Sequence, residues 1–109
     1  VYVPLPKIEE RAQVLALYRN KILLDAKQNT PEFAESVLTH LNDRIIITIA
    51  QRCDGLSNGD LEGIINSIKT DADITDTGLV TPHLVEQVVS RAIKKHRDFT
   101  HHTHAAYAA

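Results

Sequence analysis

Residues 55–61 read Gly55-Leu56-Ser57-Asn58-Gly59-Asp60-Leu61 and mark the end of one helix and the start of another. Gly55 suits the left-handed conformation in which many helices end. Ser57 followed by Asp60 resembles a capping box, with Asp where Glu or Gln is usual. The apolar residues that follow keep helical spacing and predict a helix over 58–72. Its expected buried face consists of Leu61, Ile64, Ile65 and Ile68.

Similar start signals occur on both sides of this stretch. Thr30-Pro31 and Thr81-Pro82 each place a capping residue before a proline that suits the first helical turn. Together with apolar residues at helical spacing, they predict four further helices. The expected ranges are 7–24, 31–41, 43–54 and 82–98.

The run Ile45-Ile46-Ile47-Thr48-Ile49 is open to two interpretations. Its β-branched side chains favour a strand. However, Ile45, Ile49 and Cys53 are spaced by four, and Leu41 extends this series backward. We therefore expect a helix that ends near Asp54.

Size and composition limit the classes of protein that fit. A chain of 109 residues, 43% of them hydrophobic, supports one small domain with a modest core. The formal net charge of −2 argues against a domain whose main partner is nucleic acid. With Cys53 as the single cysteine, no disulfide can form within the chain.

Targeting signals are also missing from the sequence. No apolar run approaches the length of a membrane span, and no signal peptide is recognisable at the start. The chain begins at Val1 and contains no methionine, so we expect it to be an excised fragment or a processed chain. An intracellular location follows as an expectation, with cytoplasm and mitochondrial matrix both open.

Four motifs in order resemble a known family. The chain opens with an apolar, proline-containing segment and an acidic pair before arginine, and an apolar run follows. The stretch 55–61 comes next, and a Gly-apolar-Thr turn precedes the last predicted helix. The apolar, proline-containing segment is Val1-Tyr2-Val3-Pro4-Leu5-Pro6. The acidic pair before arginine is Glu9-Glu10-Arg11, and the apolar run after it is Val14-Leu15-Ala16-Leu17-Tyr18. The turn before the last helix is Gly78-Leu79-Val80-Thr81. In this order they resemble the C-terminal helical lid of an AAA+ ATPase.

The resemblance covers residues 1–99 and implies an all-α fold. It implies a four-helix bundle with one inserted helix after the first helix and a short extended segment, Leu79-Val80, before the last. Residues 1–6, with two prolines, are also expected to be extended. The inserted helix resembles those in lids of mitochondrial ATAD-type membrane AAA proteins. Residues 100–109 have no periodicity, and we expect a flexible His/Ala-rich tail there.

The family's nucleotide contacts correspond to four positions of this chain. Val14 matches an aliphatic residue that packs against adenine, and Tyr18, one turn later, matches a position near the base or ribose. Asn58 and Gly59 match a pair of small residues whose backbone approaches the nucleotide, although the family usually has Gly and Ala there. No sensor arginine is present at 57–61, so the chain resembles the branch that lacks it.

The resemblance also implies cofactor and partners. ATP would bind between this lid and the protein's own P-loop domain, which would hold Mg²⁺ and carry the phosphate chemistry. The other expected partners are neighbouring subunits of a homo-oligomeric ring, with no nucleic acid and no membrane segment. Alone, the fragment is expected not to be catalytic, because no triad, paired-carboxylate site or redox pair is recognisable.

Other functions stay open as alternatives. The first is a helical protein–protein interaction or adaptor module with no nucleotide role. The second is a nucleic-acid or anionic-lipid surface at Lys94, Lys95 and Arg97, although cations near a helix end are also favoured by the helix dipole. Glu10 and Arg11 are expected to be solvated or to bridge to the absent domain.

Two clusters with metal-binding residue types are not expected to bind metal. The histidines near the end lack fixed geometry and further ligands. The aspartates of the 71–76 segment lack the glutamate that a calcium loop requires downstream. The residues concerned are His96, His101, His102, His104, Asp71, Asp73 and Asp76.

Overall fold

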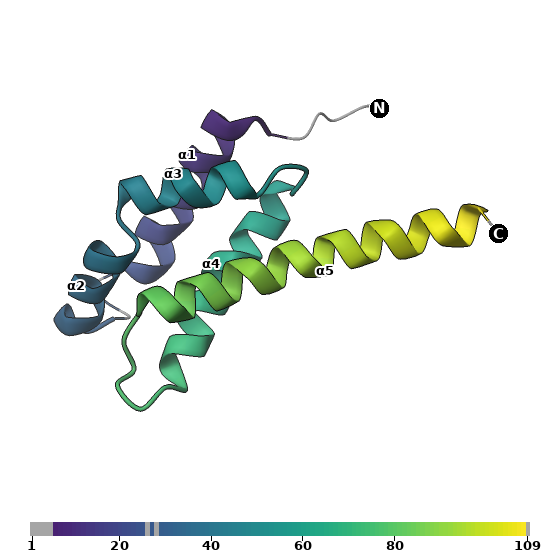
Figure 1. The fold of residues 1–109 in the computed structure, drawn as a ribbon. Coiled ribbons are helices and arrows are strands. Elements are labelled where there is room, and N and C mark those ends of the chain that lie inside the picture. The colour runs from purple at the N-terminus through teal and green to yellow at the C-terminus, as the bar shows by residue number, and fades with distance from the viewer. Residues whose placement is uncertain (1–5, 26, 28, 109) are drawn as a thin grey trace.

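The computed structural model describes residues 6–25, 27 and 29–108, and all its regular elements are helices (Figure 1). This confirms the predicted all-α class and the helical interpretation of Ile45–Ile49 for the described part of the chain. Residues 1–5, which carry most of the opening motif, lie outside it. The helices are α1 (Ile8–Tyr18), the π-helical segment η1 (Arg19–Leu23), α2 (Pro31–His40), α3 (Asp43–Arg52), α4 (Asn58–Asp73) and α5 (Pro82–Ala108).

One hydrophobic core joins all of these elements. α1 packs against both α3 and α4, and α4 also packs against α5. Among the described residues, α1, η1, α2, α3, α4 and α5 each contribute at least one of the largest fully buried side chains, and α2 supplies Val37 together with the nearly buried Phe33. Buried aliphatic side chains of this kind supply about 1.5–3 kcal/mol each relative to exposure. The face expected for 58–72, Leu61, Ile64, Ile65 and Ile68, is buried as predicted.

Helix starts agree with the capping signals in the sequence. The Thr30 hydroxyl accepts from the Phe33 N–H at 3.2 Å, and the Thr81 hydroxyl accepts from the Leu84 N–H at 3.2 Å. At α3 the cap is Asn42, whose side-chain oxygen accepts from the Ile45 N–H at 3.0 Å. These contacts are local in sequence, so pattern alone can find them.

The first helix differs from the single α-helix expected over 7–24. Its last turn is the π-helical segment η1, in which the Leu24 N–H donates to the Arg19 carbonyl at 3.1 Å. Asn29 then closes the turn, because its side-chain amide donates to the carbonyls of Ile22 and Asp25. The wider turn coincides with the buried side chain of Arg19, which contacts the α2–α3 junction.

α5 is longer than the predicted 82–98. It continues as helix to Ala108, so the helix extends through the segment that was predicted to be a tail (Figure 1). The C-terminal part of α5 extends beyond the other helices and therefore needs no apolar stripe. The cations at 91–97 consequently lie in the middle of this helix, so complementing its dipole does not explain them.

Some apolar residues of the predicted stripes are not buried. Ile8 and Leu17 of α1, two apolar residues of the helix predicted over 7–24, are 47% and 60% exposed. Leu38 of α2 and Ile47 of α3 are exposed to a similar degree. The buried face of α1 is thus narrower than the sequence pattern predicted, and aliphatic side chains are left on three helices.

Candidate functional site

The start of α4 is built by the stretch 55–61. Gly55 has φ +87°, the left-handed conformation predicted for a helix stop. The Ser57 hydroxyl accepts from the Asp60 N–H at 3.2 Å, while the Asp60 carboxylate accepts from the Ser57 N–H at 3.0 Å. The capping box is therefore complete even with Asp in place of Glu.

Asn58 and Gly59 occupy the first two helical positions and are exposed. A Cβ at Gly59 would meet only the Ser57 hydroxyl oxygen, at 3.8 Å, so neither its backbone geometry nor its neighbours require glycine. The backbone N–H groups in the first turn of a helix lack partners within that helix and attract negative charge. The start of α4 is therefore open to a ligand.

Val14 and Tyr18 lie one turn apart on α1, as the spacing of four predicted. Both are half-buried and pack against the core, and α1 packs against α4. These contacts fit a structural role and leave part of each side chain accessible.

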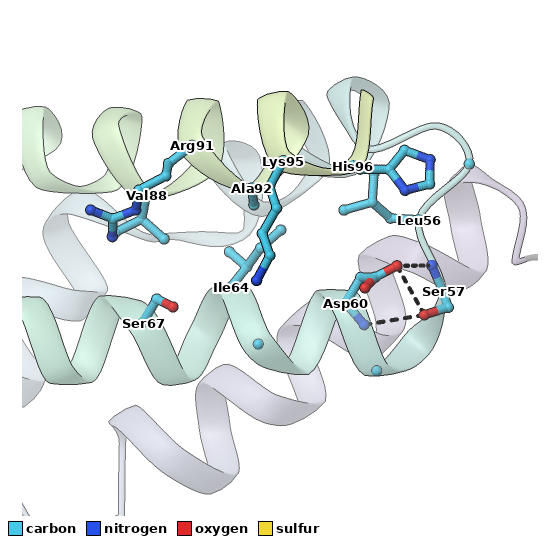
Figure 2. A pocket seen from close by; sticks show the side chains of 13 residues that line it. Leu56, Ser57, Asp60, Ile64, Ser67, Val88, Arg91, Ala92, Lys95 and His96 are labelled. Atoms are coloured by element: carbon cyan, nitrogen blue, oxygen red, sulfur yellow. Dashed lines mark hydrogen bonds between the residues drawn. The ribbon is translucent and has the colours of Figure 1, made fainter. Parts of the chain in front are cut away.

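A groove of about 690 Å³ lies between the N-terminal half of α4 and the middle of α5 (Figure 2). Its lining includes Leu56, Ile64 and Val88, which are only 1–2% exposed, and the half-buried Ala92. Gly59, Gly63 and Ser67 follow one another along α4. Of the four residues predicted to contact nucleotide, Gly59 lines the groove, whereas Val14, Tyr18 and Asn58 do not. This groove could not be predicted from sequence patterns, because it depends on how α4 and α5 pack.

Two cationic side chains and a histidine line the α5 wall of the groove. Lys95 extends from α5 toward α4, and His96 lies beside Leu56 (Figure 2). Arg91 also lines the groove and pairs with Asp71 at 2.6 Å. The Asp60 carboxylate on the opposite side is engaged by the capping box.

Arg11 corrects the expectation of a solvated or bridging residue. It is 3% exposed, and its Nε donates to the Ala50 carbonyl at 2.8 Å while a terminal nitrogen donates to the Pro6 carbonyl at 2.9 Å. The same guanidinium lies 3.7 Å from the carboxylate of Asp54. Arg11 therefore holds α1 against the C-terminal end of α3.

Arg19 holds the first helix against the N-terminal end of α3, and this role was not predicted from the sequence. It is 7% exposed, donates to the Leu41 carbonyl at 3.2 Å and pairs with Asp43 at 2.8 Å. Arg11, Leu15 and Arg19 follow one another at intervals of four, so all three share one helix face. Because Leu15 is fully buried, the spacing of four could have predicted that Arg11 and Arg19 also lie on the buried face of the helix.

Among the described residues, two groups have shifted pKa values. Burial raises the pKa of the Cys53 thiol, with a smaller opposing effect from Arg11 and Arg52. Cys53 is buried. The hydrogen bond from Arg52 lowers the pKa of Glu86, which links α3 to α5 at 2.7 Å. Neither group lines the groove.

Two aspartates in the last turn of α4 make ion pairs. Asp71 pairs with Arg91, and Asp73 pairs with Lys69 at 3.3 Å. Both carboxylates therefore serve to fix the end of α4. The segment that follows contains Gly78 at φ +67°, the residue with which the predicted Gly78-Leu79-Val80-Thr81 turn begins.

Comparisons of the chain with protein-family models, with curated proteins and with solved structures find no match. Within the described ranges, no helix has both the length and the apolar character needed to cross a membrane. Functional inference for this chain therefore depends on its own residues and their geometry.

Proposed function

We propose that this chain is the helical lid of an AAA+ ATPase. In this role it closes over ATP bound to a P-loop domain of the same protein, which would also hold Mg²⁺. Val14, Tyr18, Asn58 and Gly59 contribute contacts on the adenine side. The observation that carries the proposal is the capped start of α4, where Gly59 leaves the helix backbone open.

The order of the helices supports this proposal. The four helices that the resemblance requires correspond to α1 with η1, α3, α4 and α5, and α2 is the inserted helix. The left-handed Gly55 and the Ser57–Asp60 box stand where the family's motif falls between its second and third helices. The resemblance rests on sequence motifs, and the helical architecture is compatible with it.

The contacts between the helices suit a lid that moves as one rigid body. Arg11 and Arg19 fix α1 along α3, and a single core connects the helices. Nucleotide can move a rigid lid only by binding more tightly to one of its placements than to another. In this account the lid would transmit its movement to a neighbouring subunit of a homo-oligomeric ring.

The phosphate chemistry would then take place outside this chain. Phosphoryl transfer relies on a phosphate cradle, a metal and a positioned nucleophile. We therefore expect the isolated chain to release no phosphate from ATP. Turnover by the purified chain in a phosphate-release assay would contradict the proposal.

The gene itself offers a further test. Upstream of Val1 we expect Gly-x-x-x-x-Gly-Lys-Ser/Thr and an Asp-Glu box within about 150–200 residues, the scale of one further domain. An upstream region that encodes neither motif would favour the interaction-module alternative.

That alternative would place its contacts on exposed aliphatic side chains. Four such side chains on α1, α2 and α3 are about half exposed and could contact a partner if they lie in one patch. They are Ile8, Leu17, Leu38 and Ile47. Loss of a partner on substitution of Leu17 or Leu38, without any effect on nucleotide binding by the full protein, would support the alternative.

A further inference from the structure

The pair Asn58-Gly59 opens α4, and the packing of this chain requires neither residue. Both are exposed, and the Asn58 side chain makes none of the hydrogen bonds found among the described residues. Gly59 has no positive φ, and a Cβ there would meet only the Ser57 hydroxyl oxygen, at 3.8 Å. Alanine would suit this helix better than glycine. The fold therefore leaves both residues free for chemistry with solvent.

The backbone N–H of Gly59 lies in the first turn of α4. Such N–H groups lack a partner within their own helix. The capping box provides acceptors for the N–H groups of Ser57 and Asp60, at 3.0 and 3.2 Å, and the Ser57 carbonyl accepts from Leu61 at 3.0 Å (Figure 2). Among the described residues, no hydrogen bond uses the Gly59 N–H. A reactive nitrogen with an unengaged proton therefore follows directly after an asparagine.

We propose that Asn58 is a site of spontaneous deamidation. Hydroxide removes the proton of the Gly59 N–H, and the nitrogen then attacks the side-chain carbonyl carbon of Asn58, where a C–N bond forms. The side-chain amide nitrogen leaves as ammonia, taking a proton from water and regenerating hydroxide, and a cyclic succinimide remains. Water adds to either carbonyl carbon of this ring and opens it to aspartate or isoaspartate. Overall a water is consumed and an ammonia is released, with no change of oxidation state.

Two features of this position favour ring closure. Gly59 has no Cβ to obstruct the approach of its nitrogen to the asparagine side chain. The positive end of the helix also stabilises the deprotonated nitrogen and the oxyanion of the tetrahedral intermediate. The neighbouring Asp60 carboxylate would repel these charges, but it accepts hydrogen bonds from the N–H and hydroxyl of Ser57, each at 3.0 Å, which reduce its effect.

The helical conformation opposes the reaction and sets its rate. Ring closure needs a rotation about the Cα–C bond of Asn58, away from the helical ψ, and this rotation unwinds the first turn of α4. Helix ends open locally at a lower free energy than core segments. The box between Ser57 and Asp60 holds this turn, so its strength controls how often Asn58 reaches the reactive geometry.

Asn66 of the same helix provides a comparison. It is exposed like Asn58, but the residue after it, Ser67, lies in the interior of α4. There each N–H donates to the carbonyl four residues before it. Ring closure at Asn66 would therefore break the middle of the helix. The fold predicts deamidation at Asn58 and protection at Asn66.

Each product changes the start of α4. Isoaspartate carries the main chain through the side-chain carbon of residue 58, which lengthens the backbone between Ser57 and Asp60 so that the capping box cannot close. Aspartate keeps the main chain and places a negative charge at the positive end of the helix, where it is favoured. The inference does not depend on the lid function, because the reaction needs only water and this chain.

The test incubates the 109-residue chain in mildly alkaline buffer, native or unfolded in urea, and follows it by mass spectrometry. Trypsin releases residues 53–69, which contain both asparagines, and fragmentation assigns the gain in mass to residue 58 or 66. Isomerisation at Asp54-Gly55 leaves the mass unchanged and does not interfere. The ratio of native to unfolded rates removes the intrinsic difference between the two sequences, and it should be at least about tenfold higher for Asn58 than for Asn66.

Two substitutions test the nucleophile and the control by the cap. Gly59→Ala adds a Cβ beside the attacking nitrogen and should slow the reaction about tenfold or more. Ser57→Ala should speed up the native reaction about fivefold, the factor that corresponds to an N-cap of ordinary strength. Thr70→Ala, at an exposed residue of the same helix, should leave the rate within about twofold of wild type. In urea, Ser57→Ala and wild type should react at equal rates, and circular dichroism establishes that each variant keeps its helices in buffer.

Several results would overturn the inference. The first is no gain in mass at residue 58 of the native chain while the urea-unfolded chain reacts fully. The second is an equal ratio of native to unfolded rates at Asn58 and Asn66. An unchanged rate in Gly59→Ala would exclude its nitrogen as the nucleophile, and an unchanged rate in Ser57→Ala would exclude control by the capping box. None of these measurements involves ATP turnover, so their failure leaves the proposed lid function standing.

Discussion

Arg11 on α1 donates through Nε to the backbone carbonyl oxygen of Ala50, near the C-terminal end of α3, at 2.8 Å. The carbonyls near the end of a helix lack partners within that helix and carry partial negative charge. A buried guanidinium meets both needs, because it is a donor and a cation. This contact fixes the end of α3 from which the stretch 55–61 leads to α4.

Replacing Arg11 should therefore destabilise the fold. Arg11→Met removes the donor to the Pro6 carbonyl and leaves the buried Ala50 carbonyl with only the Cys53 N–H, at 3.3 Å, and we expect a loss of about 2–4 kcal/mol in the free energy of unfolding. Urea denaturation followed by circular dichroism measures this loss. Arg44→Met, at an exposed arginine of α3, should change stability by less than about 0.5 kcal/mol. Equal effects of the two substitutions would show that Arg11 has no special structural role.

The glycines of this region should respond to alanine with opposite signs. Gly55→Ala places a side chain at φ +87° with its Cβ 3.3 Å from His96 Nε2, so we expect a loss of about 1–2 kcal/mol. Gly63→Ala adds a better helix former in open space and should gain about 0.5–1 kcal/mol. Thermal or urea denaturation of the two variants gives both values. A destabilising Gly63→Ala would mean that the space above this residue is occupied in the native chain.

The capping box should contribute measurably to α4. Ser57→Ala removes the acceptor of the Asp60 N–H and should cost about 1 kcal/mol. Thr70→Ala, an exposed residue of the same helix, is the matched control and should have little effect. Urea midpoints that do not distinguish the two variants would contradict a structural role for the box.

The starts of α2, α4 and α5 could be predicted from the sequence because their capping contacts are local. Thr30, Ser57 and Thr81 bond to backbone groups three residues away, so the pattern contains both partners. Gly55 was likewise predictable, because few residues tolerate its conformation. The predicted start of each α-helix agrees with the structure to within one residue.

Most of the features that the sequence patterns did not predict depend on contacts between residues that are distant in sequence. The exception is the extension of α5 past residue 99. Arg11 bonds to a residue 39 positions away, and the groove needs α4 and α5 in their final packing. The π-helical turn at η1 coincides with a long-range contact of Arg19 with Leu41. Residues beyond 99 lack an apolar stripe, yet α5 continues to Ala108.

The single thiol offers a probe of stability. Cys53 is buried and its pKa is raised, so a thiol reagent should label it slowly in the native state and quickly in urea. A raised pKa in the folded state means that the thiol's contribution to stability is full below its ordinary value of 9.0 and is lost as pH rises above it. Stability relative to Cys53→Val should therefore fall at alkaline pH. A relative stability that does not change with pH would contradict the shift.

The central claim is that the start of α4 contacts ATP held by a P-loop domain of the same protein. The most direct measurement is the KM for ATP of the full-length gene product, compared between Gly59→Leu and Gly63→Leu. The account predicts that Gly59→Leu raises KM about tenfold or more by blocking the open backbone, while Gly63→Leu, one turn further along, leaves KM within about twofold of wild type. No ATP turnover by the full-length protein, or an unchanged KM in Gly59→Leu, would contradict the claim.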